Sequence, residues 1–194
     1  MIRFTNIAAL LSTALFTLAT TAAAQSADSR FEVRPFIGAY IPTGDQRDVL
    51  DDAITVGAQG AYAVTNNLSI VGTFSLTPSS NKQISLYDDV DVFTYDIGAE
   101  LHKSFSVGSR GMRLSPFIGV GAGGRTYDYR DLDTNSETTF AGYGAIGGHV
   151  QRGSIGFRLE ARDYVSSFKG LSGELTESET RNDVAIFTAI SFSF

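Results

Sequence analysis

Several residue types are absent or rare in this sequence, and each absence excludes a class of protein. None of the 194 residues is a cysteine, so a disulfide framework and a cysteine-linked lipid anchor are both excluded. Tryptophan is also absent, so any aromatic belt at a membrane surface has to consist of tyrosine and phenylalanine. For such a belt the sequence offers Tyr40, Tyr62, Tyr143, Tyr164 and Phe168.

Positive charge is scarce as well. The 15 lysines and arginines are outnumbered by 21 aspartates and glutamates, which gives a formal net charge of −6. Proteins that bind nucleic acid neutralise phosphates with clusters of lysine and arginine. We therefore expect no nucleic-acid partner.

The first 24 residues are typical of a cleaved signal peptide. Arg3 precedes a mostly apolar run from Ile7 to Ala19, and Ala22–Ala24 places small residues where a signal peptidase cuts. Residues 25–194 then remain as one domain. No stretch of that domain approaches the roughly 20 consecutive apolar residues of a transmembrane helix.

In residues 25–194, apolar side chains recur at every second position, which is the period of a β-strand. The last segment, "NDVAIFTAISFSF" from Asn182 to Phe194, shows the period most clearly: Val184, Ile186 and Ile190 share one face with Phe192 and Phe194. The same pattern predicts seven further strands. Their ranges are about 31–41, 53–64, 68–77, 91–104, 113–124, 138–150 and 154–165.

The lengths of these segments and of their connections predict a membrane barrel. A tilted strand crosses a bilayer in roughly nine to eleven residues. Connections near 65–67, 106–111 and 151–153 are short, whereas those near 42–52, 78–90, 125–137 and 166–182 are long. Outer-membrane barrels alternate in this way, with the short turns on the periplasmic side. The fold class that we predict is all-β: an eight-stranded, antiparallel, up-and-down transmembrane β-barrel.

The letters PFIG occur twice, at Pro35–Gly38 and Pro116–Gly119. Proline cannot donate a hydrogen bond to a neighbouring strand and usually lies at a sheet edge or a strand start. A closed barrel has no edge strand. We therefore expect both prolines near the periplasmic rim, at the starts of strands one and five, with their rings facing lipid.

Charged residues alternate with apolar ones in several of the strands. In "SIGFRLEARDYV" the apolar positions face outward, which turns Arg158, Glu160 and Arg162 inward. The interior of an eight-stranded barrel is just wide enough to be filled by side chains, and bidentate contacts between arginine and carboxylate are strong. We predict a lumen charge network in which Arg158 and Arg162 meet carboxylates of the opposite wall. Its members are Glu32, Arg34, Asp96, Glu100, Arg158, Glu160 and Arg162.

Other candidate sites are weaker. The long connections are acidic, with Asp45, Asp48, Asp51 and Asp52 in the first and Asp128, Asp131, Asp133 and Glu137 in the third. Asp131, Asp133 and Asn135 resemble the start of a calcium loop, but Ser136 and Gly142 occupy positions that require glycine and glutamate. Two distant histidines without cysteine do not predict a transition-metal site. We assign no metal and no cofactor.

A catalytic reading rests on His102 and Ser104, which lie two residues apart on one predicted strand. A His-x-Ser pair on a barrel strand resembles lipid A deacylases. Those enzymes have an adjacent Asn- and Gly-rich stretch and an acid that orients the histidine, and "FSVGSRG" provides neither. Ser104 is also expected beside a periplasmic turn, far from outer-leaflet lipid. We assign no catalytic residue, and we expect His149 to form a hydrogen bond in the lumen or at its rim.

The export signal, the period-two strands and the C-terminal "FTAISFSF" resemble small outer-membrane β-barrel proteins of the outer-membrane protein A/X and opacity-protein type. The resemblance covers essentially all of residues 25–194, and "FRLEARDYV" is typical of penultimate strands in these barrels. It implies that Phe194, Phe192 and Ile190 form the signal read by the barrel-assembly machinery. It also implies outer-membrane lipid and lipopolysaccharide as surroundings.

From these observations we expect a bacterial outer-membrane protein that is not an enzyme. It would act as a surface structural or interaction protein, with a lumen largely plugged by salt bridges and an extracellular partner that the sequence does not name. A narrow channel for ions or small solutes is the alternative, and a lipid A-modifying enzyme is a more remote one. A barrel that is soluble in the periplasm is a further alternative for the fold, but it would need polar outward faces.

Overall fold

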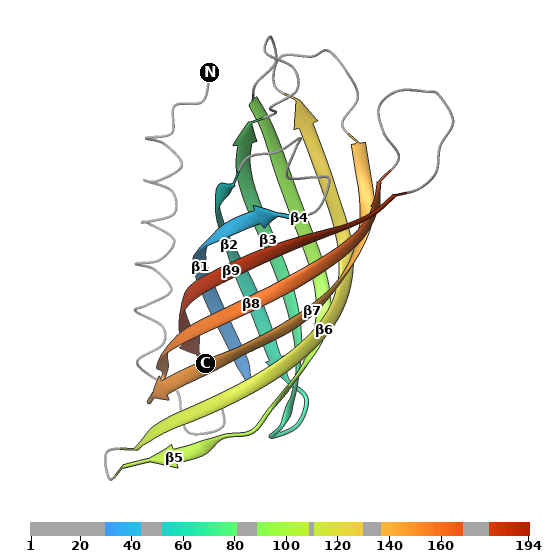
Figure 1. The fold of residues 1–194 in the computed structure, drawn as a ribbon. Coiled ribbons are helices and arrows are strands. Elements are labelled where there is room, and N and C mark those ends of the chain that lie inside the picture. The colour runs from blue at the N-terminus through green and yellow to red at the C-terminus, as the bar shows by residue number, and fades with distance from the viewer. Residues whose placement is uncertain (1–29, 44–51, 81–88, 109–110, 130–136, 169–178) are drawn as a thin grey trace.

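The computed structural model describes residues 30–43, 52–80, 89–108, 111–129, 137–168 and 179–194 (Figure 1). The predicted signal peptide, residues 1–24, lies outside these ranges, as do Asp45, Asp48, Asp51, Asp131 and Asp133 of the acidic connections. No helix in the described part of the chain has the length and apolarity needed to cross a membrane. Its strands are β1 (Phe31–Pro42), β2 (Ala53–Ala63), β3 (Leu68–Ser80), β4 (Asp89–His102), β5 (Phe105–Val107), β6 (Met112–Tyr129), β7 (Glu137–Arg152), β8 (Ile155–Phe168) and β9 (Glu179–Ser193).

The strands form one antiparallel sheet that closes on itself. Each strand pairs with its neighbours in the order β4-β3-β2-β1-β9-β8-β7-β6-β5, and an additional pairing between β4 and β6 completes the ring. The short β5 continues the line of β4 and pairs only with the start of β6. The predicted eight-stranded antiparallel barrel is therefore confirmed, with β4 and β5 as two pieces of one wall strand.

Short connections gather at one end of the barrel, the lower end in Figure 1. They are residues 64–67, the turn bounded by Gly108 and Gly111, and residues 153–154; we call this the turn end, and the opposite end is the loop end. Gly108, Gly111 and Gly153 occupy these turns with positive φ angles of 67°, 68° and 61°. Glycine adopts this left-handed region without steric cost, which allows the strands to reverse within a few residues.

The barrel closes with a stagger that tilts its strands. A row of paired residues that leaves β6 at Met112 passes Arg152 and Ile155 and continues around the wall. It returns to β6 at Ala122, ten residues further along the chain. Closure of a sheet into a barrel requires such a shear and the strand tilt that accompanies it. The stagger decides which inward side chains from distant strands lie at the same height.

The two prolines interrupt the hydrogen-bond ladders on opposite walls. Pro116 accepts from the Lys103 amide through its carbonyl, at 3.2 Å, but it has no amide hydrogen to return. The wall strand breaks at this point into β4 and β5. The pairing of β1 with β9 is likewise interrupted beside Pro35, between the pairs Val33–Phe192 and Phe36–Ala189. Both interruptions lie in the turn-end half of the wall, as the sequence predicts.

Side chains alternate between an apolar outer surface and a polar interior. On the outside, Ile97 and Val120 are each 66% exposed and Phe140 is 69% exposed. On the inside, Arg34, Arg158, Glu160 and Arg162 are each at most 3% exposed. A water-soluble barrel places apolar side chains inside and polar ones outside, so this inverted pattern is that of a protein surrounded by lipid.

Two expectations from the sequence need correction. The strands run further toward the loop end than predicted, most clearly where β6 continues through Tyr127 and Asp128 to Tyr129. Those residues therefore belong to the wall, because pairing with β4 persists as far as Val90–Tyr129. Of the proposed aromatic belt, Tyr40, Tyr143 and Tyr164 are buried in the interior, since their parity along the strand turns them inward, and Tyr62 faces outward.

Candidate functional site: the polar interior and the turn-end cavity

Seven charged residues, six of them buried and Glu32 partly buried, form a continuous series in which acid and base alternate, and we call it the charge chain. Arg34 binds Glu32 at 2.6 Å and Glu100 at 3.4 Å. Arg158 binds Glu100 at 2.6 Å and Glu160 at 2.9 Å. Arg162 binds Glu160 at 2.5 Å and Asp96 at 3.0 Å. The order across the lumen is Glu32, Arg34, Glu100, Arg158, Glu160, Arg162, Asp96, and these are the residues that the sequence singles out.

The strand period explains how β8 supplies the centre of the chain. Arg158, Glu160 and Arg162 are two residues apart, so they project from one face of the strand. Glu160 therefore lies between the two guanidinium groups and accepts from the Nε atom of each, at 2.9 Å from Arg158 and 2.5 Å from Arg162. The outer nitrogens remain free to reach across the lumen. Arg158 contacts both carboxylate oxygens of Glu100 on β4, at 3.2 Å and 2.6 Å.

Neutral side chains add hydrogen bonds to the charge chain, although the Asp96 Oδ1 atom has no partner among the described residues. Gln59 donates to Glu160 at 3.0 Å. Arg162 donates to the Thr73 hydroxyl at 3.0 Å and to the Tyr164 hydroxyl at 3.2 Å, and Tyr164 donates to Asp96 at 2.9 Å. A buried charge is costly unless it is paired and its remaining donors and acceptors are satisfied. These contacts reduce that cost for the central members of the chain.

Aromatic rings pack against the same guanidinium groups. The guanidinium carbon of Arg158 lies 3.5 Å from the centre of the Phe117 ring, and that of Arg162 lies 4.2 Å from the Tyr143 ring. Such cation–π contacts are stronger where water is excluded. The rings also fill the space between the charged groups, so the lumen is packed as well as ion-paired.

A second buried ion pair, nearer the loop end, is absent from the sequence-based prediction. Arg125 lies 2.5 Å from Asp183 and donates to the Tyr40 hydroxyl at 3.3 Å. Its guanidinium also lies 4.2 Å from the Tyr164 ring. The sequence pattern predicts a strand over 113–124, the segment that corresponds to β6, and thus leaves Arg125 in the connection that follows. Continuation of the period-two pattern through Gly123, Arg125 and Tyr127 is the signal that would have placed Arg125 inward.

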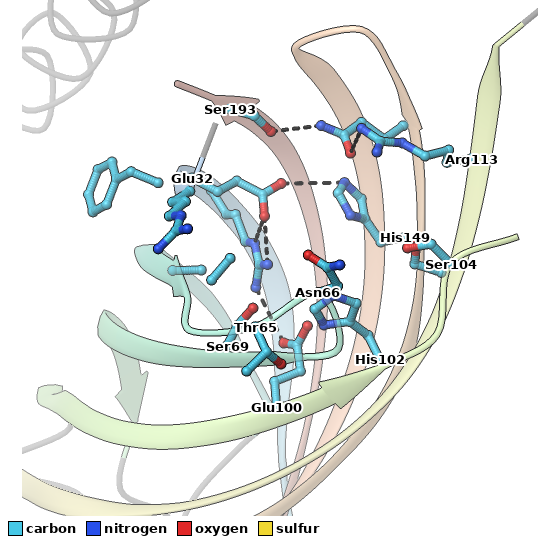
Figure 2. Close-up of a pocket in the computed structure, with 17 residues that line it drawn as sticks. Glu32, Thr65, Asn66, Ser69, Glu100, His102, Ser104, Arg113, His149 and Ser193 are labelled. Atoms are coloured by element: carbon cyan, nitrogen blue, oxygen red, sulfur yellow. Dashed lines mark hydrogen bonds and ion pairs between the residues drawn. The ribbon is translucent and has the colours of Figure 1, made fainter. Parts of the chain in front are cut away.

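The turn end of the lumen holds a polar cavity of about 320 Å³ (Figure 2). Arg34 and Glu100 of the charge chain line it, and Glu32, His102 and His149 point toward it from three strands. His149 shares a hydrogen bond of 2.7 Å with Ser191, as predicted for a lumen residue, and its Nε2 atom lies 3.5 Å from Glu32. The cavity therefore reaches from the turn end to the first members of the charge chain.

The His102–Ser104 pair lacks the geometry of a catalytic pair. The Ser104 hydroxyl shares a hydrogen bond of 2.8 Å with Ser115. The Nδ1 atom of His102 is buried and has no hydrogen-bond partner within the described residues. No acid therefore orients the ring through that nitrogen, and the interruption beside Pro116 separates the two residues into the end of β4 and the segment that follows it. No group of three or more metal-ligating side chains occurs among the described residues.

The predicted C-terminal signal lies at the turn end. Ile190 is half-exposed on the outer surface of β9, and Phe192 shares its face. Phe194 follows β9 and exchanges backbone hydrogen bonds with Phe31 at 2.8 Å and 3.4 Å. The rings of Phe31 and Phe194 lie 6.5 Å apart. The chain thus ends where the first strand begins, beside the β1–β9 seam.

Comparisons with known proteins agree with this architecture. The model of the outer membrane protein β-barrel domain matches residues 8–188. Neisserial surface protein A is similar in structure, with a TM-score of 0.57 and 12% identity over 84% of this chain and 97% of that one. OprG from Pseudomonas aeruginosa gives 0.54 and 14% over 86% and 96%. The N-terminal barrel domain of Pseudomonas aeruginosa OprF gives 0.53 and 12% over 86% and 98%.

A comparison with curated protein sequences gives no match. The family model covers most of the chain, and the solved structures share its fold. The protein belongs to the outer-membrane protein β-barrel family, and its location is the bacterial outer membrane. The expected family, fold class and location are confirmed.

Proposed function

We propose that the protein is a non-enzymatic surface protein of the outer membrane whose barrel is an anchor with a sealed lumen. The observation that carries the proposal is the charge chain, because ions that cross the lumen would have to separate buried, mutually paired charges. Removing one partner from a buried pair costs about 3–5 kcal/mol. Several linked pairs in series oppose spontaneous opening more strongly than an isolated pair does.

In this proposal the long connections at the loop end make the contacts with partners outside the cell. By analogy with other outer-membrane barrels, the turn end faces the periplasm and the long connections face the exterior. These connections carry the acidic residues noted above, among them Asp48 and Asp131. They would repel other anionic surfaces and attract cationic partners or divalent ions loosely. Lipopolysaccharide around the barrel, and the assembly machinery acting on Phe194, Phe192 and Ile190, are the further partners that we propose.

Conductance in planar bilayers tests the sealed lumen. Folded protein, verified by its heat-modifiable migration in gels, is inserted at known amounts, and we expect no steady current. The variant Glu160→Ala removes the carboxylate shared by Arg158 and Arg162 and is expected to produce discrete openings. Arg152→Ala changes an exposed charge at the turn end that does not line the cavity, and it serves as the matched control. Steady currents from the unaltered protein would contradict the sealed lumen.

A narrow channel is the second candidate, and the turn-end cavity favours it. The cavity already provides a polar path as far as Arg34 and Glu100, so a modest rearrangement of the charge chain would extend that path. This candidate predicts openings in the unaltered protein whose ion selectivity changes in Glu100→Gln. The non-enzymatic part of the proposal is tested separately: we expect no release of acyl chains from lipopolysaccharide by the unaltered protein or by His102→Ala.

A further inference from the structure

The outer wall carries a groove near the turn end, and its position results from the Pro116 interruption. The groove has a volume of about 420 Å³ and is lined by Leu101, Ile118 and Ile146 on its apolar side. Lys103 and Asn67 stand at its turn-end rim. We call it the Lys103 groove. It opens on the lipid-facing surface, since Leu101, Ile118 and Ile146 are 54%, 58% and 64% exposed.

The register explains why a groove forms here. Leu101, Ile118 and Ile146 pair in one row across three strands, and Phe105, Leu114 and Val150 pair in another. Both rows consist of large apolar side chains and form ridges on the outer surface. The row between them contains Pro116 paired with Gly148. Pro116 lines the groove, and Gly148 lies beside it without belonging to the lining. A Cβ atom at Gly148 would have no atom within 4 Å, so this row leaves a valley between the ridges next to Pro116.

The rim of the Lys103 groove is held in place by hydrogen bonds. Asn67 donates from its side chain to the His102 carbonyl at 3.0 Å, and the His102 amide donates to the Asn67 carbonyl at 2.9 Å. The Lys103 amide donates to the Pro116 carbonyl at 3.2 Å. These contacts fix the backbone that leads into the lysine, so its side chain extends from a defined position.

The Lys103 ammonium group is available to an anion. It lies 5.6 Å from the centre of the Phe105 ring, and Lys103 is exposed. Within the described residues no carboxylate pairs with it. An ammonium on a lipid-facing wall near the membrane boundary reaches the headgroup layer, where it meets phosphate. The groove thus combines an apolar channel with a cation at one end.

We propose that the Lys103 groove binds one anionic phospholipid, with an acyl chain along the apolar row and the phosphate at Lys103. Charge complementarity and continuity with the lipid-facing surface favour this occupant. The turn end faces the phospholipid leaflet in the orientation proposed above, which argues for a phospholipid and against lipopolysaccharide. The site is independent of whether the lumen conducts, because it lies on the opposite side of the wall.

The absence of tryptophan permits a direct test. A single tryptophan at Leu114, on the ridge beside the groove, reports local lipid through quenching by brominated chains. The barrel is folded into phosphatidylcholine vesicles that contain dibrominated phosphatidylglycerol or, in parallel, dibrominated phosphatidylcholine at equal mole fraction. We expect the relative association constant at this reporter to favour phosphatidylglycerol by about five-fold, the preference that one lysine near a membrane surface provides.

Variants in the same Leu114→Trp background separate the parts of the site. Lys103→Ala is expected to reduce the preference to about one-fold, whereas Arg152→Ala, which removes another exposed turn-end cation, is expected to retain it. Gly148→Leu places a side chain in the valley beside Pro116, at the edge of the groove, and should also abolish the preference. Gly144→Leu is its matched control, because a Cβ at Gly144 likewise meets no atom within 4 Å. Each variant is first checked for heat-modifiable migration, so that only folded barrels are compared.

Several outcomes would overturn the proposal. They are equal quenching by the two lipids at Leu114→Trp, an unchanged preference in Lys103→Ala, an unchanged preference in Gly148→Leu, and an equal preference at a Phe140→Trp reporter, which lies on the outer wall far from the groove. Loss of the preference in Arg152→Ala would also overturn it, because the effect would then be diffuse surface charge. A parallel arm with lipopolysaccharide as competitor must leave the preference intact.

Discussion

The Asp96–Arg162 pair at the end of the charge chain allows the energetics of the interior to be measured. Both side chains are 1% exposed, and Arg162 donates to Asp96 at 3.0 Å. Asp96 otherwise accepts from Tyr164 at 2.9 Å. Asp96→Asn keeps the size of the side chain and removes its charge. Arg162→Met keeps the apolar stem and removes the guanidinium, which leaves Asp96 charged in the interior.

The expected magnitudes follow from the partners that remain. After Asp96→Asn, Arg162 still binds Glu160 at 2.5 Å, so we expect a loss near the lower end of the range for a broken buried pair, about 3 kcal/mol. After Arg162→Met, Asp96 has lost its cation and Glu160 one of two. We expect about 5 kcal/mol. The double variant should lose less than the sum of the two by about 1–3 kcal/mol, because the residues interact directly.

Equilibrium unfolding by guanidinium in phospholipid vesicles provides the assay, with the free energy of unfolding taken by linear extrapolation. Arg113→Met is the control, since Arg113 is exposed at the turn end and its loss should change stability by no more than about 0.5 kcal/mol. Strict additivity of the two single losses would refute the interaction. Single losses as small as that of the control would refute the buried, ion-paired interior.

Further predictions concern the wall, the C-terminus and the second ion pair. Gly38→Ala should lower the free energy of unfolding by about 1–3 kcal/mol, because a Cβ there would overlap the Ile186 carbonyl and the Phe187 ring, whereas Gly144→Ala, with open space around it, should be neutral; equal effects would contradict the packing. Phe194→Ser should reduce the amount of barrel assembled in cells several-fold while purified protein unfolds within about 1 kcal/mol of the parent; parallel losses in both assays would argue for a purely structural role. Arg125→Gln should cost about 3–5 kcal/mol in the same unfolding assay, and a loss as small as that of Arg113→Met would remove Arg125 from the buried interior.

Period-two patterning made the fold readable from the sequence. Along most of β8 and β9 an outward apolar side chain alternates with a polar or small one, apart from the inward-facing Tyr164 and Phe187. The strands, their faces and their number could therefore be predicted together. Glycine-containing turns marked the reversals, with Gly153 as one example. The break at Lys103–Ser104 was not predicted, although Pro116 was recognised as a missing donor. Locating the break requires the register, which depends on the stagger of the whole barrel.

The alternation of inward and outward positions along each strand identified the members of the charge chain, but it did not show which of them pair with one another. Nothing local in the sequence states that Arg158 meets Glu100 while Arg162 meets Asp96, because that choice depends on the stagger between β4 and β8. Arg125 was missed for a different reason: it lies among acidic and turn-forming residues near a strand end, where composition indicates a loop while pairing with β4 and β7 continues. Asp183 falls within the predicted last segment, Asn182–Phe194, but the alternation assigns faces only from Val184 onward.

The account depends most on the claim that the charge chain separates the turn-end cavity from the rest of the lumen. The protein has no native cysteine, so a single introduced thiol reports on one position. Ala63 lines the cavity, whereas Ala189 faces inward and pairs with Arg158. In folded barrels, a charged water-soluble thiol reagent should label Ala63→Cys rapidly and leave Ala189→Cys unmodified until the protein is unfolded. Equal labelling of the two folded variants would show an open interior and would contradict the account.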